Sequence, residues 1–141
     1  MIAYLREPNA TQDYVDKEFN PLEIQNNAII SVVTVGEIRA IALKNGWGIN
    51  RTRKIEGLLK QVIIADINSE DVINRYAEID AFSQGRLDGR KSNFTARNIG
   101  KNDLWIAATA SVLDATLLTT DNDFQHLHDE FLTVGKINLN I

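Results

Sequence analysis

The chain of 141 residues contains no cysteine. It therefore has neither a disulfide framework nor a thiolate zinc site, and this absence favours an intracellular, cytoplasmic protein. It also contains no apolar run long enough to span a membrane or to form the centre of a signal peptide. No Gly-rich phosphate loop and no serine–histidine–acid grouping stands out, which disfavours a P-loop protein and a serine hydrolase. The length and a hydrophobic fraction of 44% predict one globular domain over residues 1–141.

Acidic side chains outnumber basic ones overall, and the basic ones are concentrated in the middle of the chain. The formal net charge is −4, yet residues 39–101 carry twelve basic and seven acidic side chains. Lysine and arginine supply the sequence-independent part of nucleic-acid affinity, so phosphate contacts are expected in this middle stretch. The same basic residues are explained equally well as ordinary solvent-exposed residues on the outer faces of helices. The candidate RNA-binding residues are Arg53, Lys54, Arg90 and Lys91.

Hydrophobic patterns predict an α/β chain. Apolar runs rich in β-branched residues predict strands at 28–33, 61–67, 115–118 and 131–137. Helical periodicity predicts helices at 1–6, 11–19, 34–42, 51–60, 69–82 and 103–113, with Ser69 as the N-cap of the fifth. Strands that alternate with helices form a mostly parallel sheet covered by helices. The sequence therefore predicts an α/β sandwich.

Carboxylates follow two of the predicted strands and open one predicted helix. Glu37 follows the strand at 28–33, Asp121 and Asp123 follow the strand at 115–118, and Asp103 begins a buried helix. In open α/β sheets, ligands bind beyond the carboxyl ends of the strands. Carboxylates brought together there repel one another, and a divalent cation that prefers oxygen ligands relieves the repulsion.

Each of these acidic residues also has a purely structural explanation. Asp103 complements a helix dipole, and Asp121 or Asp123 caps a short helix suggested at 124–127. Glu37 lies three residues after Thr34, which is the spacing of a capping box. Spacing alone does not decide between the two explanations for Glu37, and its position after a strand favours a functional role.

The residues around these carboxylates resemble a known family. Residues 102–110 (NDLWIAATA), a strand, and then residues 119–124 (TTDNDF) are similar to the third and fourth motifs of PIN-domain nucleases, in particular VapC-type toxins. Residues 31–40 (SVVTVGEIRA) resemble the second PIN motif. The resemblance extends over nearly the whole chain and implies a PIN-like three-layer α/β sandwich with a mostly parallel sheet.

The resemblance also implies a function. It implies a Mg²⁺- or Mn²⁺-dependent endoribonuclease, the toxin of a type II toxin–antitoxin pair, which forms homodimers and is neutralised by a small antitoxin protein. Glu37, Asp103 and Asp121 would hold the metal, and Asp123 would support the cluster. Asn102 and Thr119 would orient ligands. An alternative of a different class is a nuclease-dead PIN fold that binds nucleic acid or protein.

The start of the chain departs from the PIN pattern. Residues 2–6 (IAYLR) resemble the segment that follows a first, central strand and its aspartate in PIN domains, and neither that strand nor that aspartate precedes them here. We therefore expect a domain truncated at its N-terminus, with four strands where the family has five. The missing carboxylate is the main reason to consider the nuclease-dead alternative.

Overall fold

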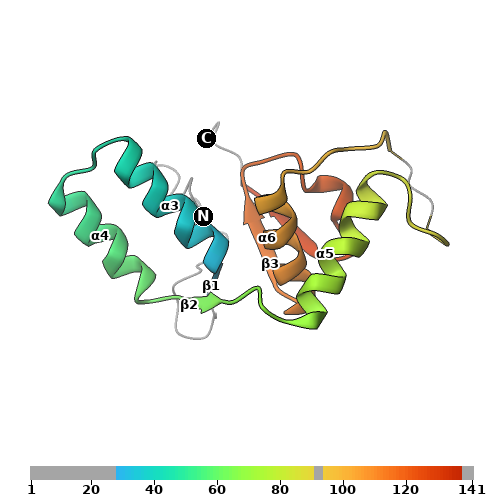
Figure 1. Cartoon of the computed structure of the whole chain (residues 1–141), viewed down its shortest axis with the longest axis horizontal. Coiled ribbons are helices and arrows are strands. Elements are labelled where there is room, and N and C mark those ends of the chain that lie inside the picture. The colour runs from blue at the N-terminus through green and yellow to red at the C-terminus, as the bar shows by residue number, and fades with distance from the viewer. Residues whose placement is uncertain (1–27, 91–93, 138–141) are drawn as a thin grey trace. The chain divides into compact units, whose positions relative to one another are not determined.

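The computed structural model describes residues 28–90 and 94–137. The chain divides into two compact units, with the boundary between Ala65 and Asp66. Unit 1 is described over residues 28–65, and unit 2 over residues 66–137 apart from the gap at 91–93. Figure 1 draws unit 1 in blue to green and unit 2 in green to red. The helices expected at 1–6 and 11–19 lie outside the described residues.

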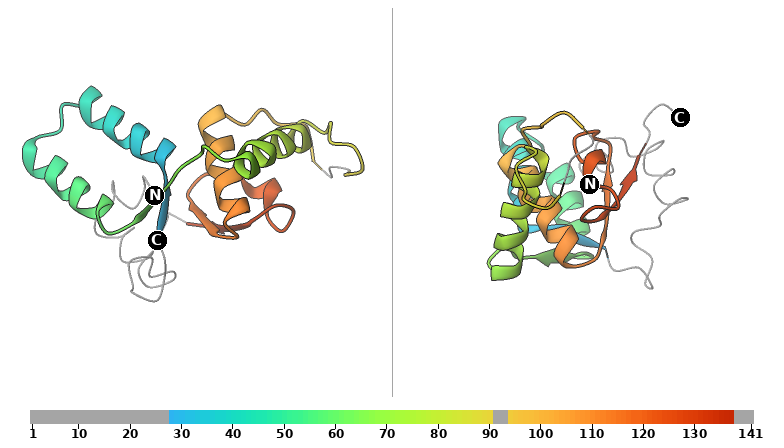
Figure 2. Two further views of the ribbon diagram at one scale, coloured as in Figure 1. Left: turned by 60° about the horizontal axis from the view of Figure 1, so that its bottom comes forward. Right: turned by 90° about the vertical axis from the view of Figure 1, so that its right-hand side faces the viewer.

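The described part of unit 1 contains two short strands and two helices. In chain order these are β1 (Ile29–Ser31), α3 (Val32–Lys44), α4 (Ile49–Leu59) and β2 (Ile63–Ala65). The strands are parallel, with Ile29 opposite Ile63. The two helices are joined by a short loop, as Figure 2 shows. A small core holds the unit together, and Trp47 and Val62 pack against it; its buried members are Ile30, Val35, Ile38, Ile55 and Leu59.

Helix α3 begins earlier than its sequence suggests. Ser31 is the N-cap of α3, and its hydroxyl accepts a 3.2 Å hydrogen bond from the amide of Val33. This cap satisfies one of the donors that every helix N-terminus leaves unpaired. The strand predicted at 28–33 therefore ends at Ser31, and Thr34 already lies inside the helix. The capping box proposed between Thr34 and Glu37 is wrong, because the cap lies three residues earlier.

Unit 2 contains two long helices, two strands and one short 3₁₀ helix. In chain order these are α5 (Glu70–Ser83), α6 (Lys101–Val112), β3 (Thr116–Thr119), η1 (Gln125–Leu127) and β4 (Thr133–Lys136). Helices α5 and α6 pack side by side (Figure 1). Strands β3 and β4 are parallel, with Thr116 opposite Thr133. The buried core of this unit is formed by Val72, Ile79, Phe82, Leu104, Ala107, Ala108, Ala110, Phe124, Leu127, Leu132 and Val134.

The helix ends in unit 2 agree with the sequence in one case and differ in the other. Ser69 caps α5 as predicted, and its hydroxyl accepts a hydrogen bond from the amide of Val72. Helix α6 begins at Lys101 with Gly100 as its N-cap, two residues before the predicted start at Asp103. Ile73 of α5 is exposed although it is apolar. A surface helix needs only a stripe of apolar residues, and Val72, Ile79 and Phe82 provide it.

All four predicted strands are present, and each pairs in parallel with one neighbour. Among the described residues they form two two-stranded sheets, β1–β2 and β3–β4. Each of these strands is three or four residues long; β1, β2 and β4 are shorter than the runs that predicted them, and β3 has the predicted length but begins one residue later. The mostly parallel arrangement is confirmed, and one domain over residues 1–141 stays a prediction. None of the described helices is long and apolar enough to cross a membrane.

Candidate metal centre

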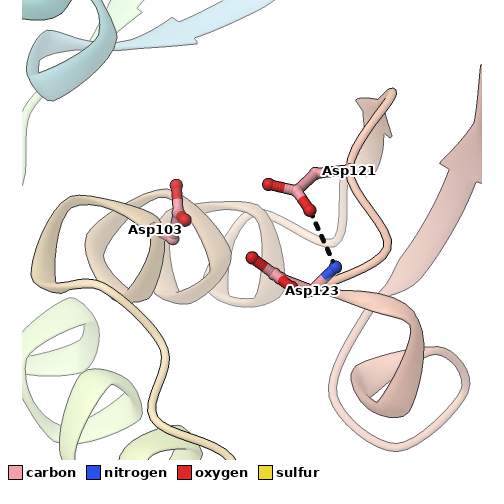
Figure 3. Close-up of side chains that lie close together, drawn as sticks. All are labelled: Asp103, Asp121 and Asp123. Atoms are coloured by element: carbon pink, nitrogen blue, oxygen red, sulfur yellow. Dashed lines mark hydrogen bonds between the residues drawn. The ribbon is translucent and has the colours of Figure 1, made fainter.

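Three aspartates from two neighbouring segments of unit 2 gather at one place. Asp103 lies in the first turn of α6, while Asp121 and Asp123 lie in the turn that follows β3. Figure 3 shows their carboxylates pointing into the same space, one from the helix and two from the loop. One carboxylate oxygen from each residue lies within 4.8 Å of the other two. The structure thus brings together three of the residues singled out from the sequence.

The turn that carries Asp121 and Asp123 is shaped by its own side chains. The amide of Asp121 donates a 3.0 Å hydrogen bond to the hydroxyl of Thr119, and the amide of Asp123 donates one of the same length to Oδ1 of Asp121. Such Asx and ST turns fold the backbone locally. Neither aspartate caps η1, whose N-cap is Phe124 without a side-chain hydrogen bond. The capping explanation for Asp121 and Asp123 is therefore wrong.

The position of Asp103 agrees with both explanations given for it. It lies in the first turn of α6, where the helix dipole stabilises negative charge. Its Oδ2 lies 3.9 Å from the place where a side chain at Gly100 would begin, so the carboxylate leans back toward the helix start. The positive end of the helix dipole also lowers the electrostatic free energy of two further carboxylates near Asp103. The same position therefore serves the dipole and the cluster.

The donor set fits a hard divalent cation. Oxygen ligands around Mg²⁺ lie about 2.0–2.1 Å from the ion, so two of them are at most about 4.2 Å apart. The observed limit of 4.8 Å is a little wider, and small rotations of the carboxylates would close the difference. Three carboxylates in this space also repel one another, which a cation would offset. Asp121 and Asp123 are exposed and Asp103 is half-buried, so solvent can supply the remaining ligands.

The two supporting residues predicted from the sequence lie at the edges of this cluster. Thr119 is the last residue of β3, and its buried side chain holds the turn through the amide of Asp121. Asn102 precedes Asp103 on α6, and its side chain is exposed. Thr119 is thus a structural support of the turn, and a ligand-orienting role for Asn102 stays a prediction.

Glu37 lies in unit 1, in the second turn of α3, and is half-buried. Because Ser31 caps the helix, the Glu37 carboxylate is not needed to complete the helix start. The structural explanation considered for this residue thereby loses its basis. Its role as a metal ligand stays a prediction that rests on the sequence.

The four candidate RNA-binding residues differ in exposure and in whether their charge is already paired. Arg53 and Lys54 are exposed on α4. Arg90 donates hydrogen bonds to the carbonyl and the carboxylate of Glu130, and its guanidinium lies 4.2 Å from the centre of the Phe131 ring. Its charge is already paired, so it contributes less to phosphate binding than Arg53 or Lys54. Lys91 lies outside the described residues.

His126 contacts the acidic turn and was not recognised from the sequence as part of this region. It lies in η1, and its Nε2 forms a 2.8 Å hydrogen bond with the hydroxyl of Ser83, which is completely buried in α5. Burial lowers the pKa of His126, the positive charge of Arg97 lowers it further, and Asp123 acts in the opposite direction. The only signal in the sequence is its position three residues after Asp123.

Comparisons with known proteins identify the family of the chain. The model of the PIN domain family matches residues 1–130. The chain therefore belongs to the PIN domain family. A comparison with curated proteins found no match.

Two solved structures share the fold. The structure of VapBC-1 from nontypeable Haemophilus influenzae matches with a TM-score of 0.69 at 24% identity, over 96% of this chain and 90% of that chain. The structure of VapBC2 from Rickettsia felis, which is bound to a DNA fragment from the promoter of these proteins, matches with a TM-score of 0.73 at 21% identity. The match covers 97% of this chain and 92% of that chain. The predicted PIN-like α/β fold with parallel strands is thus confirmed.

Proposed function

We propose that this protein is a divalent-metal-dependent endoribonuclease in which Asp103, Asp121 and Asp123 form the metal centre. The observation that carries the proposal is the convergence of these three carboxylates within 4.8 Å of one another in a chain of the PIN family. On the strength of its sequence motif, Glu37 is proposed as a further ligand. The ion would be Mg²⁺ or Mn²⁺, both of which prefer oxygen donors.

The residues of the cluster have separate tasks in this proposal. Asp103 and Asp121 would bind the ion directly, and Asp123 would add negative charge and hydrogen-bond acceptors beside it. The hydroxyl of Thr119 keeps Asp121 in place through the backbone. A bound divalent cation supplies Lewis acidity, which makes water a better nucleophile and offsets charge on a phosphodiester during attack. Arg53 and Lys54 would hold the RNA backbone by charge.

We further propose that the protein is the toxin of a type II toxin–antitoxin pair. The support is the fold that the chain shares with the structures of VapBC-1 and VapBC2. In this role the chain would act in the cytoplasm, form a homodimer and be inhibited by a small antitoxin protein. Light scattering of the purified protein tests the dimer, and a monomer at all concentrations would contradict it.

Cleavage of RNA tests the proposed function directly. Purified protein is incubated with labelled single-stranded RNA and Mg²⁺ or Mn²⁺, and parallel samples contain EDTA. The matched variants are Asp103→Asn, in the cluster, and Asp114→Asn, on the loop between α6 and β3. We expect metal-dependent cleavage by the wild type and by Asp114→Asn, and none by Asp103→Asn.

Two results would overturn parts of this proposal. Equal cleavage by wild type and Asp103→Asn would show that the aspartate cluster is not the active site. Metal binding without cleavage of any RNA would favour the alternative of a nuclease-dead PIN fold that binds nucleic acid or protein.

A further inference from the structure

The described part of unit 1 is strongly basic although the whole chain is acidic. Residues 28–65 carry six basic side chains and two acidic ones, which gives a net charge of +4 against −4 for the whole chain. One acidic residue, Glu56, is already paired with Arg39 at 3.2 Å. The remaining basic side chains between residues 28 and 65 are exposed; they are Lys44, Arg51, Arg53, Lys54 and Lys60. Residues 1–27 of the same unit carry two basic and five acidic side chains, so the attraction for a polyanion is a local property of residues 28–65.

An aromatic ring lies within this basic region. Trp47, in the loop between α3 and α4, is half-buried and packs against the core of unit 1. The guanidinium of Arg51 lies over its ring, 4.0 Å from the ring centre. Arg51 itself is an exposed residue. The two side chains thus form a cation–π pair whose ring packs against the core, and we call this pair the platform.

Helix geometry places a further positive charge beside this platform. Arg51 and Lys54 are three residues apart on α4, so their side chains lie on the same face of the helix. Lys54 therefore lies within reach of a phosphate that belongs to a base stacked on Arg51. A stacking surface next to a phosphate-binding charge is the arrangement with which proteins hold single-stranded nucleic acid.

We propose that Trp47, Arg51 and Lys54 form a binding site for one unpaired nucleotide of single-stranded RNA. The base stacks on the Arg51 guanidinium, which is supported from behind by Trp47, and Lys54 contacts the adjacent phosphate. The identification of RNA rests on the proposed function, while the site lies entirely within unit 1. It adds recognition of an unpaired base to the backbone contacts of Arg53 and Lys54.

Single-stranded RNA fits this surface better than the other polyanions. Bases in a duplex are stacked on one another and cannot present a face to the platform, whereas unpaired bases can. An acidic peptide would satisfy the charge but would leave the flat surface unused. Base stacking on aromatic or arginine planes tolerates any base, so the site would select strandedness and not sequence.

The test separates stacking from charge. Binding is measured in EDTA, in the Asp103→Asn background, for oligouridylate, for an abasic phosphodiester of the same length, and for polyglutamate. Arg51→Lys keeps the charge but loses the plane. Arg39→Lys, in the same unit but paired with Glu56, is the matched control. At Trp47, Phe keeps an aromatic plane and Leu keeps only the apolar volume.

Arg51→Lys should weaken binding of oligouridylate by at least about fivefold, the loss of roughly one stacking interaction, and leave binding of the abasic strand unchanged. Trp47→Leu should do the same, whereas Trp47→Phe and Arg39→Lys should bind both ligands as the parent does. Equal effects of Arg51→Lys on both ligands, or none on either, would overturn the stacking site. Binding of polyglutamate as tight as that of oligouridylate would overturn it as well.

The outcome is separable from that of the nuclease proposal, because the assay requires neither metal nor cleavage. If the wild type shows normal metal-dependent cleavage and Arg51→Lys binds oligouridylate as tightly as the parent does, only the nucleotide site is rejected. The expected loss of binding in a protein that cleaves no RNA would reject only the nuclease.

Discussion

The amide of Asp123 donates a 3.0 Å hydrogen bond to Oδ1 of Asp121. Asp121 thus has two tasks, since it shapes the turn and is a candidate metal ligand. Asn keeps the acceptor oxygen but loses the charge, whereas Ala loses both. Without metal, we expect Asp121→Asn to melt near the wild type and Asp121→Ala to lose about 1 kcal/mol of stability, the value of one hydrogen bond. Thermal melting in EDTA checks this, and equal stability of the two variants would contradict it.

Metal binding should stabilise the wild-type protein. A ligand that binds only the folded state raises the melting temperature, so millimolar Mn²⁺ or Mg²⁺ should shift the wild-type transition upward. Asp103→Asn should abolish the shift because it removes one of three converging carboxylates. Asp114→Asn is the matched control, since Asp114 has a positive φ of 52° that Asn also tolerates. A wild-type transition indifferent to both metals would argue against the site.

Charge reversal tests whether Arg53 and Lys54 bind the RNA backbone. In the double variant Arg53→Glu and Lys54→Glu, RNA binding should weaken and depend less steeply on salt, because fewer counterions are released. Binding is measured by anisotropy over a range of salt concentrations. If the dependence of RNA affinity on salt concentration is unchanged, Arg53 and Lys54 are solvated surface residues that do not bind RNA.

Replacement of Arg90 should act mainly on stability. Its guanidinium is held by Glu130 and stacks on Phe131, so Arg90→Glu should lower the melting temperature by placing two carboxylates side by side. The salt slope of RNA binding should change less than in the variant at Arg53 and Lys54. A normal melting temperature with a strongly reduced salt slope would show that Arg90 binds RNA after all.

His126 should make stability depend on pH in the absence of metal. Its pKa is lowered in the folded state by burial and by Arg97, so the unfolded chain binds more protons between that lowered value and about 6.5. Stability should therefore fall as the pH drops below about 6.5. His126→Gln should show a shallower decline. Melting in EDTA between neutral and mildly acidic pH measures the difference, and parallel curves would contradict it.

The sequence predicted the elements of the structure better than their ends. Periodicity identified every described helix, and Ser69 was recognised as a cap because a hydroxyl stands directly before an apolar stripe. The start of α3 was misplaced because Val32 and Val33 favour strands by composition. The hydroxyl of Ser31 decides the outcome locally, and a capping serine inside an apolar run is hard to distinguish from a strand residue.

The acidic residues of the candidate site could be predicted from the sequence, but the side-chain contacts between distant residues could not. Three aspartates were found from their positions after a strand and at the start of a helix, and they do converge. The pairing of Arg90 with Glu130 joins residues forty positions apart, and no local pattern reveals it. The contact between Ser83 and His126 was missed for the same reason.

The parallel pairing of β3 and β4 has a consequence for the order of folding. Thr116 lies opposite Thr133, seventeen positions along the chain, whereas Ile29 lies opposite Ile63, thirty-four positions away. Pairings that close shorter loops form faster on average. The turn with Asp121 and Asp123 lies inside the shorter loop, so its backbone amides should gain protection before those of β1 and β2 when hydrogen exchange is pulsed during refolding. The loop that concentrates negative charge would then be closed early, before the strands β1 and β2 have paired.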